Sequence, residues 1–341
     1  MRRRTRKMSN RRPVVYLAII AAAALLNFIY DNYLPQPSES AAKNPAAENP
    51  APETPAAPAE RATAPESTAS APANVYRTGW PELPAERADD DRYYTRHLFG
   101  AADDGAPAVR NYSSCYSRRY RCPVWVAAPL HPSYRDEARR SDRFRFDPTL
   151  PVDIQPLLRS SYGDYTRGHL LGSAERTVSG EANAQTFYAS NIAPQLGRGF
   201  NAANGAWNNL EIFVDRQVCA DTLYVVTGCL FDDYTDAGGR RVGASATLNK
   251  NDGAEVAVPT AYYKVLLRTR AGDTGRRVAD CKSSELKCAA FVVGHYDAKG
   301  RKPSAADMMS VAEIERITGE TFFAGVPAAP KRTADPRDWG L

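Results

Sequence analysis

Histidine and cysteine are too sparsely arranged in this chain for the common zinc sites. There are four histidines among 341 residues, and the six cysteines include no Cys-x-x-Cys pair. Structural zinc sites usually draw their ligands from such closely spaced pairs. The histidine-containing motif described below also has no serine or cysteine nucleophile with an obvious base partner. The sequence therefore argues against a zinc module and against covalent acyl transfer.

An overall positive charge is also missing from most of the chain. The formal net charge is +5, but residues 1–12 alone carry seven Lys and Arg and no acid. Because the remainder is slightly acidic, any binding of nucleic acid must depend on a local basic patch. Two clusters with aromatic neighbours are candidates, with a solvated charged surface as the alternative for each. They are Arg118, Arg119 and Arg121, and Arg139, Arg140, Arg143 and Arg145.

Residues 1–75 predict an exported protein. Residues 1–12 form a basic tail, and 13–33 contain an apolar run from Val14 to Tyr30 interrupted only by Asn27. This length suits a short transmembrane anchor; a cleaved signal peptide, an organelle presequence and a buried helix are the alternatives. Residues 34–75, rich in Ala and Pro, predict a disordered linker. The basic flank should stay in the cytoplasm, which places the domain in the periplasm or outside the cell, or secretes it after cleavage.

Residues 76–330 are long enough for one well-cored domain, followed by a tail at 331–341. All six cysteines lie in this block, and in an oxidising compartment an even number favours disulfides. Sequence proximity alone suggests Cys115 with Cys122, Cys219 with Cys229, and Cys281 with Cys288. Other connectivities stay open.

Three short blocks carry the residues best suited to chemistry. Thr166-Arg-Gly-His169 is followed by Asn191-Ile-Ala-Pro-Gln195 and then by Asn201 running to Glu211. A neutral histidine can take a proton from water at pH 7, arginine can hold phosphate oxygens, and carboxamide and carboxylate oxygens suit a hard divalent cation. Together they favour metal-dependent hydrolysis of a phosphodiester.

These blocks resemble the DNA/RNA non-specific endonucleases, the ββα-metal (His-Me finger) nucleases. The family hallmark is Asp-Arg-Gly-His, then Asn-x-x-Pro-Gln, then an Asn leading into Trp-x-x-Leu-Glu, here Trp207-Asn-Asn-Leu-Glu211. Two departures stand out. Thr166 replaces the family's Asp, and the spacing from Asn201 to Trp207 is longer than expected. Either Asn201 or Asn204 could therefore supply the metal-binding carboxamide; the preceding Gly-Phe favours Asn201, whereas helical spacing to Glu211 favours Asn204.

The resemblance implies a sugar-non-specific endonuclease acting on DNA and RNA. His169 would be the general base, Arg167 would stabilise the transition state, and Asn191 would orient His169 or nearby water. Mg²⁺, or Mn²⁺ in its place, would be held by the Asn with help from Glu211, and the products would carry 5′-phosphates. A nucleic-acid-binding module with weak catalysis and a non-nucleic phosphodiesterase are the alternative functions. The oligomeric state stays open, with a homodimer as one option.

The fold class expected is α+β. Apolar runs predict strands at Val124–Ala128, Thr222–Thr227, Ala261–Arg268 and Ala289–Val293, and a helix over Gly205–Gln217. Ser310 and Glu313 predict the start of a second helix, which should stop at Gly319. The resemblance adds a central antiparallel sheet, with His169 on or beside a strand. His97, His131 and His295 are expected to be surface or satisfied core residues.

Overall fold

The computed structural model describes residues 80–100 and 108–341. These described residues belong to one compact unit. The predicted basic tail, anchor and linker lie outside the described residues. Within residues 80–100 and 108–341, no helix has the length and apolar character needed to cross a membrane. Within the segment 331–341, expected as a tail, Trp339 is buried against Phe291.

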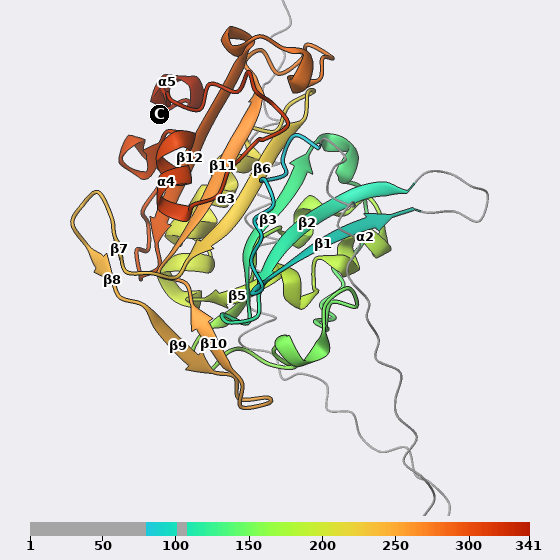
Figure 1. Ribbon diagram of the computed structural model, residues 1–341, viewed down its shortest axis with the longest axis vertical. Coiled ribbons are helices and arrows are strands. Elements are labelled where there is room, and N and C mark those ends of the chain that lie inside the picture. The colour runs from blue at the N-terminus through green and yellow to red at the C-terminus, as the bar shows by residue number, and fades with distance from the viewer. Residues whose placement is uncertain (1–79, 101–107) are drawn as a thin grey trace, which may run out of the picture. The chain divides into compact units, whose positions relative to one another are not determined.

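A seven-stranded antiparallel sheet forms the centre of the domain (Figure 1), as the α+β prediction required. In its middle, Val265 of β11 lies opposite Val226 of β6 and Ala290 of β12. The strand order is β1 (Arg92–Phe99), β2 (Val109–Ser117), β3 (Cys122–Leu130), β6 (Leu223–Leu230), β11 (Ala261–Thr269), β12 (Leu286–Gly294) and β13 (Met308–Met309).

The central strands are buried along nearly their whole length, which explains why their sequences are continuous apolar runs. All four predicted strands are present, each extended by one or more residues. Strands β1 and β2 were not predicted. Strand β1 is the edge strand and β2 lies between β1 and β3. Both contain many polar residues, including Arg92, Asn111 and Ser113, so no periodic apolar pattern marks them.

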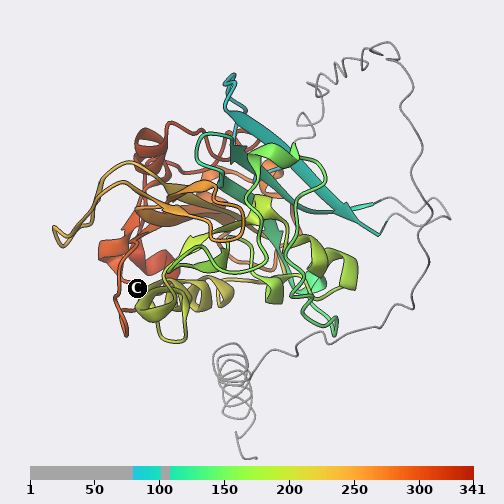
Figure 2. The same cartoon turned by 90° about the horizontal axis from the view of Figure 1, so that it is seen from below.

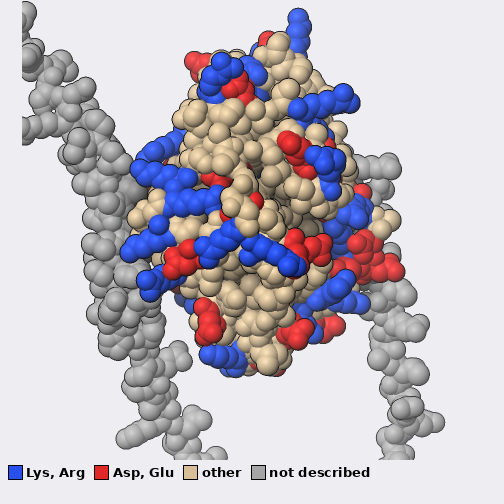
Figure 3. Space-filling model, turned by 90° about the vertical axis from the view of Figure 1, so that its left-hand side faces the viewer, with Lys and Arg blue, Asp and Glu red and all other residues tan. Residues whose placement is uncertain are grey.

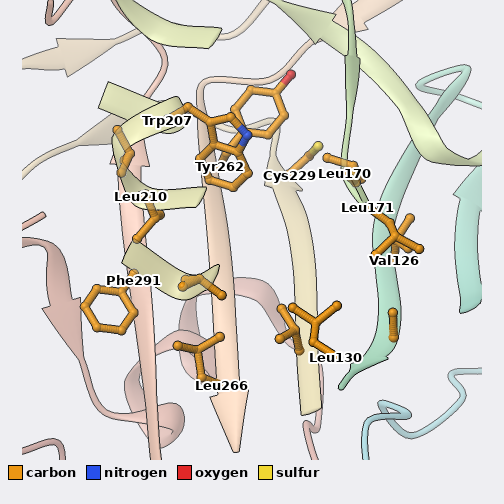
Figure 4. Close-up of a cluster of buried hydrophobic side chains, with 14 of the residues drawn as sticks. Val126, Leu130, Leu170, Leu171, Trp207, Leu210, Cys229, Tyr262, Leu266 and Phe291 are labelled. Atoms are coloured by element: carbon orange, nitrogen blue, oxygen red, sulfur yellow. The ribbon is translucent and has the colours of Figure 1, made fainter. Parts of the chain in front are cut away.

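Helix α3 (Ala206–Asp215) covers one face of the sheet and confirms the helix predicted around Trp207. Trp207, Leu210 and Val214 form its buried stripe at helical spacing. Figure 4 shows Trp207 and Leu210 facing Tyr262 and Leu266 of β11, and in Figure 2 α3 lies below the strands. This packing fixes the direction in which the helix presents its remaining side chains.

The other face is covered by α4 (Val311–Thr318), which lies against β12 in Figure 1. Ser310 accepts a hydrogen bond from the Glu313 amide, and the Glu313 carboxylate accepts one from the Ser310 amide. Gly319 ends the helix with a φ of 68°, a left-handed conformation that glycine adopts without strain. Both predicted ends of this helix are confirmed.

Three hairpins and short helices complete the described part of the chain. The hairpins are β4 (Thr166–His169) with β5 (Ile192–Gln195), β7 (Tyr234–Thr235) with β8 (Arg241–Val242), and β9 (Ser245–Leu248) with β10 (Glu255–Val258). The short helices are α2 (Gly180–Gln185) and α5 (Pro336–Trp339). Helical turns occur at η1 (Pro132–Tyr134), η2 (Val152–Ile154), η3 (Ser173–Glu175), η4 (Ala189–Asn191), η5 (Gly197–Asn201), η6 (Val278–Asp280), η7 (Ser283–Glu285) and η8 (Ala305–Asp307).

The structure corrects the disulfide prediction, because all six cysteines are free thiols. Cys115 contacts Arg92, whereas Cys122 belongs to the core cluster that packs against α3. Cys219 precedes β6 and Cys229 lies near the far end of that strand, so the strand itself keeps them apart. Proximity in the sequence was therefore a poor guide to proximity in space.

Candidate active site

The β4–β5 hairpin brings the first two sequence blocks together. Thr166 pairs with Gln195, Gly168 with Ala193, and His169 with Ile192. Gly168 is required by close approach, because a Cβ at this position would lie 2.1 Å from the Gln195 side chain. Arg167 and His169 thus project from one face of the strand, and Thr166 and Gly168 from the other.

His169 packs edge to face against two phenylalanine rings, Phe144 and Phe187, which also contact each other at 5.0 Å. Its ring centroid is 4.8 Å from that of Phe187 and 5.6 Å from that of Phe144. Its Nε2 atom is buried and has no hydrogen-bond partner among the described residues. Burial lowers the pKa of His169 well below its ordinary value, and the charges of Arg140 and Arg167 lower it further. A neutral imidazole with an unused ring nitrogen can accept a proton.

Two guanidinium groups flank this histidine. Arg167 stacks on Phe144 at 3.7 Å and donates from Nη1 to the Leu158 carbonyl at 2.9 Å. Arg140 lies over Phe187 at 5.0 Å and pairs with Asp142 at 2.5 Å. Arg140 was predicted only as a member of a basic cluster. The mixture of arginine and phenylalanine in residues 139–145 was the signal for its place here.

The other predicted basic cluster is engaged elsewhere. Arg118 and Arg119 stack on Tyr93 and Tyr120, and Arg121 donates to the Asp153 carbonyl. Figure 3 shows basic and acidic side chains mixed on one side of the molecule, with Lys and Arg gathered across its middle. Basic charge is therefore local, in a domain whose 35 Lys and Arg nearly balance its 33 Asp and Glu over residues 76–341.

Asn191 is fully buried and bonded to the backbone. Its Oδ1 accepts from the Leu171 amide at 2.8 Å, and its Nδ2 donates to the carbonyls of Leu171 at 2.9 Å and Thr186 at 2.6 Å. The Asn191 carbonyl also accepts from the Leu170 amide at 2.9 Å. Its contacts thus hold the chain immediately after His169.

Replacing Asn191 by alanine should destabilise the domain strongly. The change leaves three buried backbone groups without their partner, each worth roughly 1–3 kcal/mol when unsatisfied. We expect the free energy of unfolding in urea to fall by about 3 kcal/mol. Asn208→Ala, which removes a single 3.3 Å bond to the Asn204 amide, is the matched control and should change little. Equal stability of the two variants would contradict this account of Asn191.

The two candidate metal-binding asparagines occupy different surroundings. The Asn201 Nδ2 lies 3.5 Å from the Thr166 hydroxyl, which itself donates to the Gln195 carbonyl at 2.9 Å. Asn204 contacts different residues. Its Oδ1 is 3.4 Å from the side-chain amide nitrogen of Asn209, and its backbone carbonyl accepts from the Gly300 amide. Asn204 also adopts a φ of 65°. Asn201 therefore lies beside the β4–β5 hairpin, and its Oδ1 has no hydrogen-bond partner among the described residues.

Glu211 lies on α3 within reach of the charges of Lys264 and Glu175. Burial raises its pKa to about 7; the charge of Lys264 opposes this rise and that of Glu175 adds to it. The Lys264 ammonium is buried, donates to the Thr227 hydroxyl at 3.0 Å and lies over the Trp207 ring. Glu175, Lys264 and Thr227 also line a cavity of about 10 Å³, room for about one water.

The candidate residues are thus brought to one hairpin and one helix without touching one another. No described contact joins His169 to Asn201, Asn204 or Glu211. Three buried polar atoms of this hairpin have no partner among the described residues: Nε2 of His169 and both side-chain amide atoms of Gln195. The oxygen donors of Asn201 and Glu211 match the preference of Mg²⁺ for hard oxygen ligands. The residues present therefore fit a hydrated divalent cation, although no group of three His, Cys, Asp or Glu among the described residues would hold one alone.

The remaining histidines have satisfied surroundings, as expected. His97 is buried and bonded to Asp147 at 2.8 Å. His131 caps the η1 turn through the Ser133 amide. His295 is buried with a partner for each ring nitrogen.

Comparison with known proteins places this arrangement. The model of the DNA/RNA non-specific endonucleases matches residues 96–329. The mitochondrial nuclease EXOG of Danio rerio is 30% identical over 266 residues, which cover 76% of this chain and 66% of that protein. Human mitochondrial endonuclease G is 30% identical over 227 residues, 64% of this chain and 69% of that protein.

A solved structure of an EndoG/EndoGI complex, described as showing the mechanism of EndoG inhibition, is also similar. It has a TM-score of 0.51 at 26% identity and covers 72% of this chain and 89% of that one. The chain spans about two thirds of the length of the curated relatives. The match runs through the β4–β5 hairpin, η5 and α3 alike, and the chain belongs to the DNA/RNA non-specific endonuclease family.

Proposed function

We propose that this domain is a metal-dependent endonuclease that hydrolyses phosphodiester bonds of DNA and RNA without strong sequence preference. The observation that carries the proposal is His169: a half-buried residue whose imidazole is kept neutral beside two arginines, with a buried Nε2 that has no partner among the described residues. The family to which the chain belongs, and the nuclease names of its relatives, support the substrate class.

In this proposal His169 accepts a proton from the attacking water. The water oxygen bonds to phosphorus as the proton passes to Nε2, and the bond from phosphorus to the 3′ oxygen breaks. This leaves a 5′-phosphate and a 3′-hydroxyl, whose proton comes from solvent. The two phenylalanine rings fix the imidazole and keep bulk water from it, which keeps the base neutral near pH 7.

Asn201 and Glu211 are the residues proposed to hold the cation, Asn201 through its carboxamide oxygen and Glu211 through a water. Mg²⁺, or Mn²⁺ in its place, would neutralise negative charge on the phosphate and the leaving oxygen. Thr166 takes over part of the support that an acid gives at this position in the family pattern, because its hydroxyl contacts both the Asn201 amide and the Gln195 carbonyl.

Arg140 and Arg167 are proposed to face the phosphate. Stacking on Phe144 and Phe187 restricts both guanidinium groups, so less freedom is lost when they bind oxygen. Positive charge placed beforehand at the reacting group stabilises the extra negative charge of the transition state. Asn191 acts on this site only through the Leu170–Leu171 backbone.

Incubation of the purified protein with supercoiled plasmid and with an RNA transcript, with Mg²⁺ or with EDTA, tests the proposal. We expect nicked and then short products from both substrates, and none in EDTA. Binding of both nucleic acids without any cleavage would instead favour the binding module. Cleavage of small phosphodiesters alone would favour the non-nucleic phosphodiesterase.

The pH dependence of cleavage should show the low pKa of His169. Since protonation removes the base, and burial and two arginines lower its pKa, the loss of rate on the acid side due to His169 should occur below pH 6.5. Arg140→Gln removes one of those charges and should move this limb toward higher pH. Arg139→Gln is the control. Profiles measured under single-turnover conditions should separate the two variants; identical limbs would contradict the electrostatic role of Arg140.

We also propose that the domain lies outside the cytoplasm, on the strength of the basic N-terminal residues and the apolar run after them. Protease added to intact cells or spheroplasts should then release an active fragment that begins within residues 34–75. A domain that is protected until the cells are lysed would contradict this placement.

A further inference from the structure

His295 follows β12 directly and is buried against the segment that carries Asn201. His295 is only 5% exposed to solvent. The ring centroid lies 4.7 Å from that of Phe200 and 5.2 Å from that of Tyr262, in both cases edge to face. Phe200 immediately precedes Asn201, so the imidazole touches the chain next to the proposed cation ligand.

Both ring nitrogens of His295 are used, and in different senses. Nδ1 lies 2.7 Å from the Pro259 carbonyl, which can only accept, so Nδ1 donates. Nε2 lies 2.8 Å from the Leu196 amide, which can only donate, so Nε2 accepts. These two partners require a neutral ring with its proton on Nδ1. Burial, which lowers the pKa of His295 to about 4, agrees with this state.

The Leu196 peptide continues this chain of contacts to Asn201. The Leu196 carbonyl accepts from the Asn201 amide at 3.0 Å, which closes the turn that carries the asparagine. The residues after His295 hold the same turn from its outer side, since the Ala298 amide donates to the Gly199 carbonyl at 3.1 Å. The Asp297 carboxylate fills the space next to Gly199, where a Cβ would lie 1.7 Å from Oδ1.

We propose that His295 is a positioning residue for the metal site: by accepting from the Leu196 amide it fixes the turn that aims the Asn201 carboxamide at the cation. This inference rests on the proposed function, in which Asn201 is a cation ligand. His295 touches neither substrate nor cation. Its effect passes through one hydrogen bond to Leu196, and no family motif contains it.

Three substitutions separate this role from simple filling of space. The amide group of His295→Gln can reach the position of Nε2 and keep the acceptor for Leu196. His295→Asn reaches only the position of Nδ1 and keeps the bond to Pro259. His295→Phe keeps the ring and its contacts with Phe200 and Tyr262 but loses both hydrogen bonds. Packing alone predicts that Phe is the best replacement, whereas positioning predicts that Gln is.

The test measures Mn²⁺ binding to the full chain by the loss of the free-ion EPR signal, and hydrogen exchange of residues 196–201 in metal-free protein. We expect His295→Asn and His295→Phe to weaken Mn²⁺ binding by about tenfold, the lower end of the loss seen when partners of metal ligands are removed. His295→Gln should weaken it by no more than about twofold. The backbone amides of Leu196 and Asn201 should exchange faster than in wild type in His295→Asn and His295→Phe, but not in His295→Gln. Should the Phe variant fail to fold, the comparison of Gln with Asn decides the case.

Wild-type affinity in His295→Phe, or equal losses in Gln and Asn, would overturn the positioning role. Asn201→Ala is measured alongside to separate this failure from failure of the proposed function. If Asn201→Ala binds Mn²⁺ as tightly as wild type, the ligand assignment itself is wrong and His295 has no ligand to position. If Asn201→Ala loses binding while all three His295 variants keep it, only the present inference fails.

Discussion

Cleavage by His169→Ala should be slower than wild type by about two to four orders of magnitude, the usual cost of removing a general base. The physical reason is local, because the unpartnered Nε2 is the proposed proton acceptor and no other described histidine has a free ring nitrogen near the hairpin. Single-turnover cleavage of a labelled DNA duplex at saturating Mg²⁺ measures this loss directly.

Binding and stability are the controls for this result. His169→Ala should bind the duplex in EDTA with nearly wild-type affinity, since the arginines that face the phosphate are unchanged. His131→Ala, which removes a histidine from the η1 turn, should cleave at the wild-type rate. A His169→Ala protein that cleaves at the wild-type rate would remove this residue from the mechanism.

Asn201→Ala should raise the Mg²⁺ concentration needed for half-maximal cleavage by about a hundredfold or more. Loss of a partner behind a metal ligand commonly costs 10- to 100-fold in affinity, and loss of the ligand itself should cost at least as much. Asn201→Asp keeps an oxygen donor at the same position and should retain metal-dependent cleavage. A Mg²⁺ titration of initial rates distinguishes the two variants.

Asn204→Gly is the matched control because glycine accepts the φ of 65° found at this position. It removes the amide that contacts Asn209 without straining the turn, so its Mg²⁺ dependence should stay close to that of wild type. If Asn204→Gly needs much more Mg²⁺ and Asn201→Ala does not, the two asparagines have been assigned the wrong way round.

The parts of the fold that sequence predicted well are those set by local patterns. The four apolar strands bury both faces, and α4 has a capping box at one end and a left-handed glycine at the other. Strands β1 and β2 were not predicted because their polar sequences are stabilised by pairing with neighbouring strands, which a local apolar pattern does not show. The disulfide prediction failed for a related reason: Cys115 and Cys122 have different neighbours in the fold, and strand β6 separates Cys219 from Cys229.

The site followed the same division. The three motif blocks supplied the candidates His169, Asn191 and Glu211. The sequence could not show that the Asn191 side chain forms its hydrogen bonds with the backbone of Leu171 and Thr186. It also left Asn201 and Asn204 unresolved. Contacts from the distant β12 end and from Thr166 give these two asparagines different surroundings. Arg140 joins the site through its stacking on Phe187, a contact between separate segments that no local spacing encodes.

Chemical rescue of His169→Ala tests the central claim most directly. Removing the imidazole leaves a space beside Phe144 and Phe187 that matches the ring removed, so free imidazole can enter it. If Nε2 of His169 takes the proton from water, added imidazole should restore Mg²⁺-dependent cleavage. The restored rate should rise with the fraction of imidazole that is neutral. A rate that instead grows as imidazole becomes protonated, or that imidazole leaves unchanged because the variant already cleaves like wild type, would contradict the mechanism.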